Sequence, residues 1–588
     1  MGYEELAWKI YDNGIAYQQE MGFATKWPEN MRFYDNDQWP AATENTKYLP
    51  RPVLNIIEYD IRHKRSYLLG QSQRVIFRPE DVADGDPQKV MGAAEDFTDY
   101  LGIAMEDMEY PRVTDRVYLN APVTGTGAYH FWWDNKGKGG TYIPYSGKLA
   151  CDSIKPMCFI VSNPKCEDVQ KQQHVVLACR EETEYVREMA RADGSDAKTV
   201  KAIRPDSLPT DPKYDTEEVE QLGTDMTTFL IHYYRKDGEV WWEKCTKDAK
   251  IVKPKRMNGN KLYPVVVVNW IEREGCIYGN SEVEGLIPAQ KAINTMWALN
   301  LLATQNFSSP KIILEPGALG NQRITSVVGE ILTNYSGDAN GIRYLNPPPF
   351  SGEPVRLTDS LITLVRTLKG VTEVISADRM VSDMAAAAII ALQNQAKIPL
   401  EFQQQRRQRC DEQSARIIEE FAKNFQTIKR PFMVNNAMNE PQLKVFQGDK
   451  HKNTTFKLQI EVGPSSNYSE SLNQSTLDRV YMEKSDIDLI TYLEFSSPHT
   501  ISRKEELIRL LKNQKEQSGL IEQMIQGGDI SPESAAILAE AGVFPREIGM
   551  IASEMAAQAA QMPQEQGAGE MPPTEGGEPG NAIEIGQE

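Results

Sequence analysis

The chain has 588 residues, of which 40% are hydrophobic and 25% are charged, and its formal net charge at pH 7 is −19. This length and composition indicate several globular domains and exclude a wholly disordered protein. The negative charge argues against a protein that grips nucleic acid over a broad basic surface. It is compatible with a wall along which DNA slides, because repulsion of phosphates avoids tight binding.

No segment has the features of a membrane span or a secretory signal. The longest apolar runs, at 265–268 and 385–392, are far shorter than the roughly 20 residues that a spanning helix needs. The first residues, MGYEE, offer neither a basic start nor an apolar core. We expect no membrane contact and a protein that stays in the compartment where it is made.

The seven cysteines are an odd number spread over a long chain, which predicts free thiols in a reducing compartment. Cys151, Cys158, Cys166 and Cys179, with His174 nearby, are spaced too widely for the close ligand pairs of a structural zinc site. We therefore predict no metal site and no cofactor, and interpret these cysteines as small buried hydrophobic residues.

Helical patterns dominate the first 110 residues. A surface helix is predicted over 3–22, ending before a break at Trp27–Pro28, and an aromatic loop follows at 33–40. A second helix is predicted from Pro52, in the first-turn position that proline favours. A third follows Pro87.

Strand patterns replace the helical patterns between residues 122 and 268. Asp237–Gly238 predicts a β-hairpin, and 263–270 predicts a strand covered on both faces. The stretch 193–223 is interpreted as an exposed loop or linker. Gly125-Thr126-Gly127 lacks the third glycine of a dinucleotide site, so a tight hairpin is predicted there.

Two helices that flank a small β subdomain are predicted next. Ser281 and Glu284 fit a capping box at the start of the first helix, in which Pro288 introduces a kink or marks the true start. The subdomain occupies 310–354, and the second helix runs over 355–369.

A long helix over 384–428 follows, with a predicted kink at Pro399. Strands are predicted at 432–446 and 456–462, and several helices after them. From 562 the chain is rich in Pro, Gly and Glu and contains no Lys or Arg, which predicts a disordered acidic tail.

The motifs of common enzymes are absent from the sequence. No Gly-x-x-x-x-Gly-Lys-Ser/Thr loop occurs, which excludes a P-loop ATPase. The six histidines form no HExxH pair, and no Gly-x-Ser-x-Gly elbow accompanies them. We expect no enzymatic activity, with a metal-dependent nuclease as the alternative, because carboxylate sites of that kind have weak signatures.

Several short strings resemble the portal proteins of tailed bacteriophages, over roughly residues 30–430. They are YDNDQW at 34–39, RPVLN at 51–55, GQ at 70–71, YPVVVVN at 263–269 and YGNS at 278–281, with Gln290 and Asn294. The order of elements is similar as well: a helix, an inserted β subdomain, a returning helix, a loop and a long kinked helix.

The resemblance implies an α+β, portal-type fold with a mixed α/β wing, a two-helix stem, a small β-containing clip and a helical crown. The implied parts are the N-terminal part of the wing (1–280), the first stem helix (281–308), the clip (309–354), the second stem helix (355–376), the tunnel loop (377–384), the long kinked helix with wing strands (385–468), the crown (469–561) and the acidic tail (562–588).

The resemblance also implies a virion protein, assembled in the host cytoplasm, that forms a ring of twelve subunits at one capsid vertex. Double-stranded DNA would pass through the ring during packaging and ejection. The implied partners are the terminase, the major capsid and scaffolding proteins, and the head-tail adaptor proteins. Another virion structural protein, such as an adaptor or minor capsid subunit, is a further alternative.

Candidate site residues follow from this assignment. The DNA-channel candidates are Arg379, Lys397, Arg356, Arg366 and Lys369. The tunnel-loop candidates are Asp378, Ser382 and Asp383, and the clip docking candidates are Arg323, Glu330 and Arg343. For each cation, an ordinary solvated or interface charge is the competing interpretation.

Overall fold

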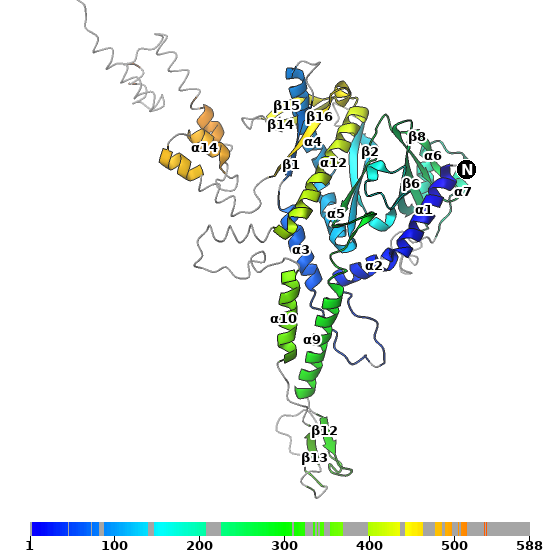
Figure 1. The fold of residues 1–588 in the computed structure, drawn as a ribbon, viewed down its shortest axis with the longest axis vertical. Helices are drawn as coiled ribbons and strands as arrows, with labels where there is room; N and C mark the ends of the chain where they lie inside the picture. Colours follow the sequence, from blue (N-terminus) through cyan, green and yellow to red (C-terminus); the bar gives the residue numbers. More distant parts are fainter. Residues whose placement is uncertain are drawn as a thin grey trace, which may run out of the picture. The chain divides into compact units, whose positions relative to one another are not determined.

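A computed structural model describes most of the chain up to residue 462 and short stretches beyond it (Figure 1). The chain divides into two compact units, Met1–Ser469 and Glu470–Glu588. The described residues are 3–44, 46–71, 73–80, 87–138, 146–206, 225–308, 311–323, 333–335, 338, 342–345, 353–368, 398–435, 441–462, 477–484, 488–496, 504, 507–513, 515, 534 and 537.

Helices and short helical turns are distributed along the described chain. The α-helices are α1 Tyr3–Glu20, α2 Phe23–Tyr34, α3 Ile56–Leu69, α4 Pro87–Asp107, α5 Tyr110–Thr124, α6 Thr183–Ala192, α7 Ala197–Ala202, α9 Ile287–Ser308, α10 Glu353–Leu368, α12 Glu401–Phe425 and α14 Leu489–Phe495. The short turns are η1 Pro156–Cys158, η2 Val169–Lys171, η3 Ile398–Leu400, η4 Gly448–His451 and the π-helical η5 Val480–Lys484.

The strands form antiparallel sheets, so the fold is of the predicted α+β kind. The five-stranded sheet has the order β4 Phe159–Val161, β5 His174–Glu182, β6 Met226–Lys236, β7 Glu239–Cys245 and β8 Lys250–Arg256. The three-stranded sheet has the order β3 Ser146–Ile154, β2 Thr126–Lys138 and β9 Val265–Asn269. Two-stranded pairs are formed by β1 Gln73–Pro79 with β16 Phe456–Val462, β10 Ile271–Arg273 with β11 Cys276–Asn280, β12 Lys311–Leu314 with β13 Ile342–Leu345, and β14 Arg430–Asn435 with β15 Pro441–Phe446.

The main core of the first unit lies where α4, α5 and α12 meet β2 and β9. Phe97 and Tyr100 of α4 are almost fully buried there with Phe421 of α12. The Tyr100 ring stacks on Phe446 of β15 at a centroid distance of 4.1 Å. Large aromatic side chains therefore join α4 to strands more than 300 positions later in the sequence, which fixes the body from which the later helices extend.

Several local predictions are confirmed. The Asp237–Gly238 turn joins β6 to β7 with positive φ angles of 54° and 78°, as a two-residue hairpin turn requires. The covered strand appears as β9, and the strands predicted at 432–446 and 456–462 appear as β14, β15 and β16.

The prediction of a tight hairpin at Gly125-Thr126-Gly127 is wrong. Gly125 ends α5 with a φ of 95°, and β2 begins at the next residue. A Cβ atom on Gly125 would lie 2.3 Å from the carbonyl oxygen of Gly279. The glycine is required because the chain turns from helix to strand in a left-handed conformation against another backbone.

Some predicted boundaries are also wrong. Helix α2 continues through Trp27–Pro28 to Tyr34, so no break occurs there. Helix α3 starts at Ile56 and not at Pro52, because the Asn55 side chain accepts a hydrogen bond from the Glu58 N–H at 3.1 Å and caps it. Helix α5 is not among the predicted elements.

Three further predictions change in detail. The stretch expected to be a loop at 193–223 contains α7, and 207–224 lies outside the described residues. Pro288 marks the start of α9, and Ser281 does not cap that helix but donates its hydroxyl to the Val123 carbonyl. Pro399 lies in the turn η3 immediately before α12, so in the described residues it precedes a helix and does not kink one.

Candidate functional site

The feature that stands out from the body of the first unit is the helix pair α9–α10. The chain leaves the body along α9, forms the antiparallel strand pair β12–β13 and returns along α10 (Figure 1). The Thr358 hydroxyl lies 3.6 Å from the Met296 sulfur, so the two helices pack directly against each other. A helix, a small β element and a returning helix therefore occur in the predicted order.

The base of the pair is held by a small apolar cluster. Side chains from α2, α3 and α5 meet the start of α9 there, and Val365 of α10 packs against them. The buried members are Phe33, Ile57, Ile61, Val123, Val283, Leu286 and Ile287. Burial of this cluster fixes both helices of the pair to the body.

A polar network surrounds this base, and we call it the root network; it consists of Gln38, Leu54, Ile56, Gln290 and Asn294. Asn294 donates its amide to the Gln38 side-chain oxygen at 2.7 Å. Gln290 accepts a hydrogen bond from the Ile56 N–H at 3.0 Å and donates to the Leu54 carbonyl at 2.6 Å. Gln290 also donates to the Asn294 side chain at 3.0 Å, one helical turn away.

The root network unites strings that are far apart in the sequence. Gln38 belongs to YDNDQW and Leu54 to RPVLN, while Gln290 and Asn294 are separate parts of the same resemblance. Gln38, Gln290 and Asn294 are all buried. Since buried amides need partners, each fixes the position of the others and thus of α9 relative to α2 and α3.

A buried ion cluster provides a second anchor, which the sequence patterns did not predict. The Lys64 ammonium on α3 lies 3.0 Å from an Asp60 oxygen and 3.1 Å from a Glu282 oxygen, and all three side chains are at most 7% exposed. Glu282 also accepts a hydrogen bond from the Trp270 indole at 2.8 Å. Asp60 and Lys64 are four positions apart on one helix face, a spacing that the sequence displays.

The helix pair exposes large apolar side chains. Helix α9 contains one charged residue, Lys291, among 22. Trp297 and Leu299 are 39% and 54% exposed, and at about 100° per residue they point about 200° apart. The other exposed apolar side chains on the pair are Leu301, Phe307, Val355, Leu357 and Leu364. Apolar surface therefore faces solvent on opposite sides of α9.

The predicted channel cations fall into different environments. Arg356 on α10 is exposed. Arg366 is half-buried, with its guanidinium 5.1 Å from the centroid of the Tyr59 ring on α3, so it packs between the helix pair and the body. Lys369, Arg379 and Lys397 lie outside the described residues.

The predicted tunnel-loop and clip residues are only partly described. Asp378, Ser382 and Asp383 lie outside the described residues, as does Glu330. Arg323 and Arg343 are both exposed, and Arg343 is the cross-strand partner of Ile313 in the β12–β13 pair. Two clip candidates are thus accessible to a partner at the end of the helix pair.

The buried His232 and the partly buried His174 form a chain of polar contacts with Glu243 across strands β5, β6 and β7. His232 lies 2.9 Å from a Glu243 oxygen through Nδ1 and 3.0 Å from Nδ1 of His174 through Nε2. Burial and the neighbouring His232 lower the pKa of His174 to about 4. The face carrying this chain is covered by α1 through Trp8 and Tyr11, which indicates a structural role.

The described residues contain no group of His, Cys, Asp and Glu side chains that could hold a metal ion. All seven cysteines are free, and Cys151, Cys245, Cys276 and Cys410 are buried. Burial raises the pKa of Cys179 to about 11, which suits an unreactive thiol.

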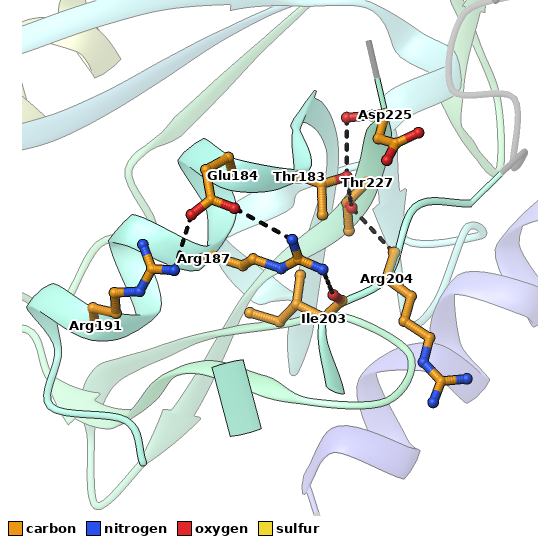
Figure 2. A network of polar contacts seen from close by, with 8 residues as sticks. All are labelled: Thr183, Glu184, Arg187, Arg191, Ile203, Arg204, Asp225 and Thr227. Carbon is orange, nitrogen blue, oxygen red and sulfur yellow. Dashed lines mark hydrogen bonds and ion pairs between the residues drawn. The ribbon is translucent and has the colours of Figure 1, made fainter. Parts of the chain in front are cut away.

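Helices α6 and α7 are fastened to β6 by a further polar network (Figure 2). Glu184 binds both Arg187 and Arg191, and these hydrogen bonds lower the pKa of the Glu184 carboxyl. Arg187 also donates to the Ile203 carbonyl at 2.9 Å, and the Thr183 hydroxyl lies 2.7 Å from that of Thr227 (Figure 2). These contacts join elements of the body to one another, so we assign the network a role in the folding of the body.

No protein-family model matches the chain, and no curated protein matches its sequence. None of the helices in the described part of the chain is long and apolar enough to cross a bilayer.

Proposed function

We propose that this chain is the portal subunit of a tailed bacteriophage, one of a ring of twelve at a capsid vertex. The observation that carries the proposal is the helix pair α9–α10, which bears exposed apolar side chains on opposite sides of α9. Packaging and ejection of DNA through the ring would be its function. The protein would act as a passive conduit and docking platform in the virion, with the motor supplied by the terminase.

The exposed faces of the pair favour a repeated contact. One neighbour can cover only one side of α9, so covering both the Trp297 side and the Leu299 side takes a neighbour on each side. When the same head-to-tail contact is repeated, it generates a ring or an open filament, depending on the angle between neighbours. A closed ring leaves every pair covered and has an axial hole. The number twelve comes from the resemblance alone.

The charge of the chain suits the passage of DNA. Duplex DNA carries one phosphate charge per about 1.7 Å of its axis. A net charge of −19 per subunit would keep the duplex from adhering to the ring, while scattered cations such as Arg356 could guide it. Replacing Arg379 with Ala should leave the ring intact and alter the packaged length or the retention of DNA; unchanged packaging and leakage would remove Arg379 from this role.

The end of the helix pair is our candidate docking surface for the terminase and then for the head-tail adaptors. Ile313 and Leu314 of β12 are 38% and 42% exposed, beside the exposed Arg343. Deletion of residues 315–350 should abolish terminase binding while the body stays folded. Undiminished binding of the terminase would refute this assignment. The capsid and scaffolding proteins would contact other parts of the ring.

The decisive experiment is negative-stain imaging of the purified full chain, together with its mass in solution. We expect rings with an axial hole. Leu299→Glu places a charge on the apolar side of α9 and should yield monomers, whereas the matched surface variant Tyr185→Glu on α6 should still form rings. If Leu299→Glu still forms rings, the apolar side of α9 does not make the contact between subunits, and the proposal loses its main support. Monomers of the unaltered chain that cut DNA with Mg²⁺ would favour a nuclease.

A further inference from the structure

A closed loop extends from the body next to the root network. Its neck, at residues 39–52, is fastened by two hydrogen bonds. The Trp39 indole donates to the Pro52 carbonyl at 2.9 Å, and Arg51 donates to the Pro40 carbonyl at 2.9 Å. The described residues 40–44 and 46–51 therefore belong to a loop whose ends are close together, and we call it the arm. Loops of this length without strands or helices are often functional.

The arm is held in a defined position relative to α9. Gln38, directly before the neck, accepts a hydrogen bond from the Asn294 amide, and the Leu54 N–H, two residues after the neck, donates to the Asn294 side chain at 3.4 Å. Both sides of the neck thus meet at one asparagine of α9. The arm is anchored at the base of the helix pair.

The tip of the arm presents an aromatic ring to solvent. Thr43 and Thr46 close a tight turn, with their hydroxyl oxygens 2.9 Å apart. Tyr48 is 80% exposed. In the part of the chain that the structure describes, the only ring contact of Tyr48 is with the ammonium of its neighbour Lys47, 5.1 Å from the centroid. A tyrosine supplies a large amphipathic contact area and is enriched where proteins bind each other.

Exposed apolar residues lie beside the neck, next to α9. Val53 and Leu54 are 36% and 43% exposed. Leu54 is bonded to Asn294, and Trp297 follows Asn294 by three positions, which places it on the same face of the helix. Exposed apolar side chains therefore occur both beside the neck, at Val53 and Leu54, and on the face of α9 to which the neck is bonded, at Trp297. In the proposed ring, this side of the pair faces a neighbour.

We infer that the arm binds the helix pair of a neighbouring copy of this chain and places Tyr48 against it. In a head-to-tail contact, one side of a subunit meets the opposite side of the next. The arm lies on the Trp297 side, so it meets the neighbour's Leu299 side. The inference rests on the proposed ring and adds a residue that fastens one subunit to the next.

Photo-crosslinking of the full-length protein tests the inference. The photoreactive residue p-benzoylphenylalanine is placed at position 48, or at Tyr185 on α6 as an exposed aromatic control. Rings are assembled from an equal mixture of ¹⁵N-labelled and unlabelled chains and then irradiated. We expect crosslinks from position 48 to residues 287–308 or 353–368, with labelled chains joined to unlabelled chains; position 185 should not reach these helices.

A binding measurement complements the crosslinking. Loss of a central tyrosine contact of about 1.4 kcal/mol corresponds to a tenfold change in affinity. Tyr48→Ala should therefore raise the concentration at which rings dissociate by about tenfold, while Tyr185→Ala should leave it nearly unchanged.

The possible outcomes distinguish the arm contact from the ring itself. The inference fails if normal rings form but position 48 crosslinks only within its own chain, crosslinks to another protein, or gives no crosslink. Each of these results would leave the proposed function standing. Tyr48→Ala rings as stable as the unaltered ones would overturn it in the same way. If the unaltered chain forms no ring, the proposed function fails and the inference with it.

Discussion

Substitution of Lys64 by Met tests the buried ion cluster at the base of the helix pair. Lys64 is the shared cation of two carboxylates, Asp60 and Glu282, and all three side chains are at most 7% exposed. Methionine preserves much of the side-chain volume but leaves two buried negative charges without their cation. Removing one partner of a buried ion pair typically costs about 3–5 kcal/mol, because the remaining charge is desolvated and uncompensated.

We expect the free energy of unfolding of the body to fall by about that amount, 3–5 kcal/mol, in Lys64→Met. Urea denaturation followed by tryptophan fluorescence is a suitable assay, because the indole of buried Trp270 is bonded to Glu282. The matched control is Arg62→Met on the same helix. Arg62 is 68% exposed and pairs with Glu58, so its loss should cost less than about 1 kcal/mol.

A second substitution distinguishes charge from packing. Glu282→Gln in the Lys64→Met background removes one of the two carboxylate charges and keeps an oxygen that can accept the Trp270 indole N–H. It should recover part of the lost stability. If Lys64→Met costs no more than Arg62→Met, or if Glu282→Gln worsens it, the cluster does not stabilise the base of the helix pair in the way that we argue.

Three other predictions concern the root network, the core and one glycine. Asn294→Ala should lower the free energy of unfolding by about 1–3 kcal/mol, because it leaves the Gln38 oxygen and the Leu54 N–H unpaired. Faster hydrogen exchange of the amides at 54–56 would report this loss. The control is Thr295→Ala at an exposed position of the same helix. Burial raises the pKa of Asp411 to about 6, above its unfolded value of about 3.9, so the folded state binds the proton more tightly. The free energy of unfolding should therefore gain about 2 kcal/mol from this group as the pH falls from 7 to 4, and denaturation at several pH values should show the gain lost in Asp411→Asn. Gly125→Ala should lower the melting temperature far more than Gly238→Ala. A Cβ atom at position 125 would lie 2.3 Å from the Gly279 carbonyl oxygen, whereas a Cβ atom at position 238 would have no atom within 4 Å. Equal losses in the two variants would contradict the steric argument.

Elements set by nearby residues were predictable from the sequence. The β6–β7 hairpin depends on two turn residues, and both adopt positive φ angles as Asp and Gly permit. The return from α9 through β12–β13 to α10 was visible in the spacing of apolar residues and turn formers. Helix α5 was missed although its spacing is amphipathic: Val113, Val117 and Tyr118 are buried, whereas Arg112, Asp115 and Arg116 on the opposite face are exposed, so this helix could have been predicted.

Elements decided by distant contacts were harder to predict. The sequence prediction started α3 at Pro52, whereas Asn55 caps the helix in the structure. The bonds from Ile56 to Gln290 and from Leu54 to Asn294 hold the preceding residues in an extended segment, so the helix starts after Asn55. Asn294 and Gln38 are 256 positions apart, and no local pattern indicates that they meet. Single members of the root network could thus be recognised in the sequence, but their assembly could not be foreseen.

The strings on which the resemblance to portal proteins rests meet in space at the base of the helix pair. Here YDNDQW, RPVLN, Gln290 and Asn294 share one set of hydrogen bonds at the base of α9. YGNS adjoins the same region, since Ser281 and the following Glu282 bond the Val123 and Pro122 carbonyls at the end of α5. These strings are therefore the parts that set the angle between the helix pair and the body. In the ring that we propose, that angle would have to be the same in every subunit, and buried polar contacts would keep it so.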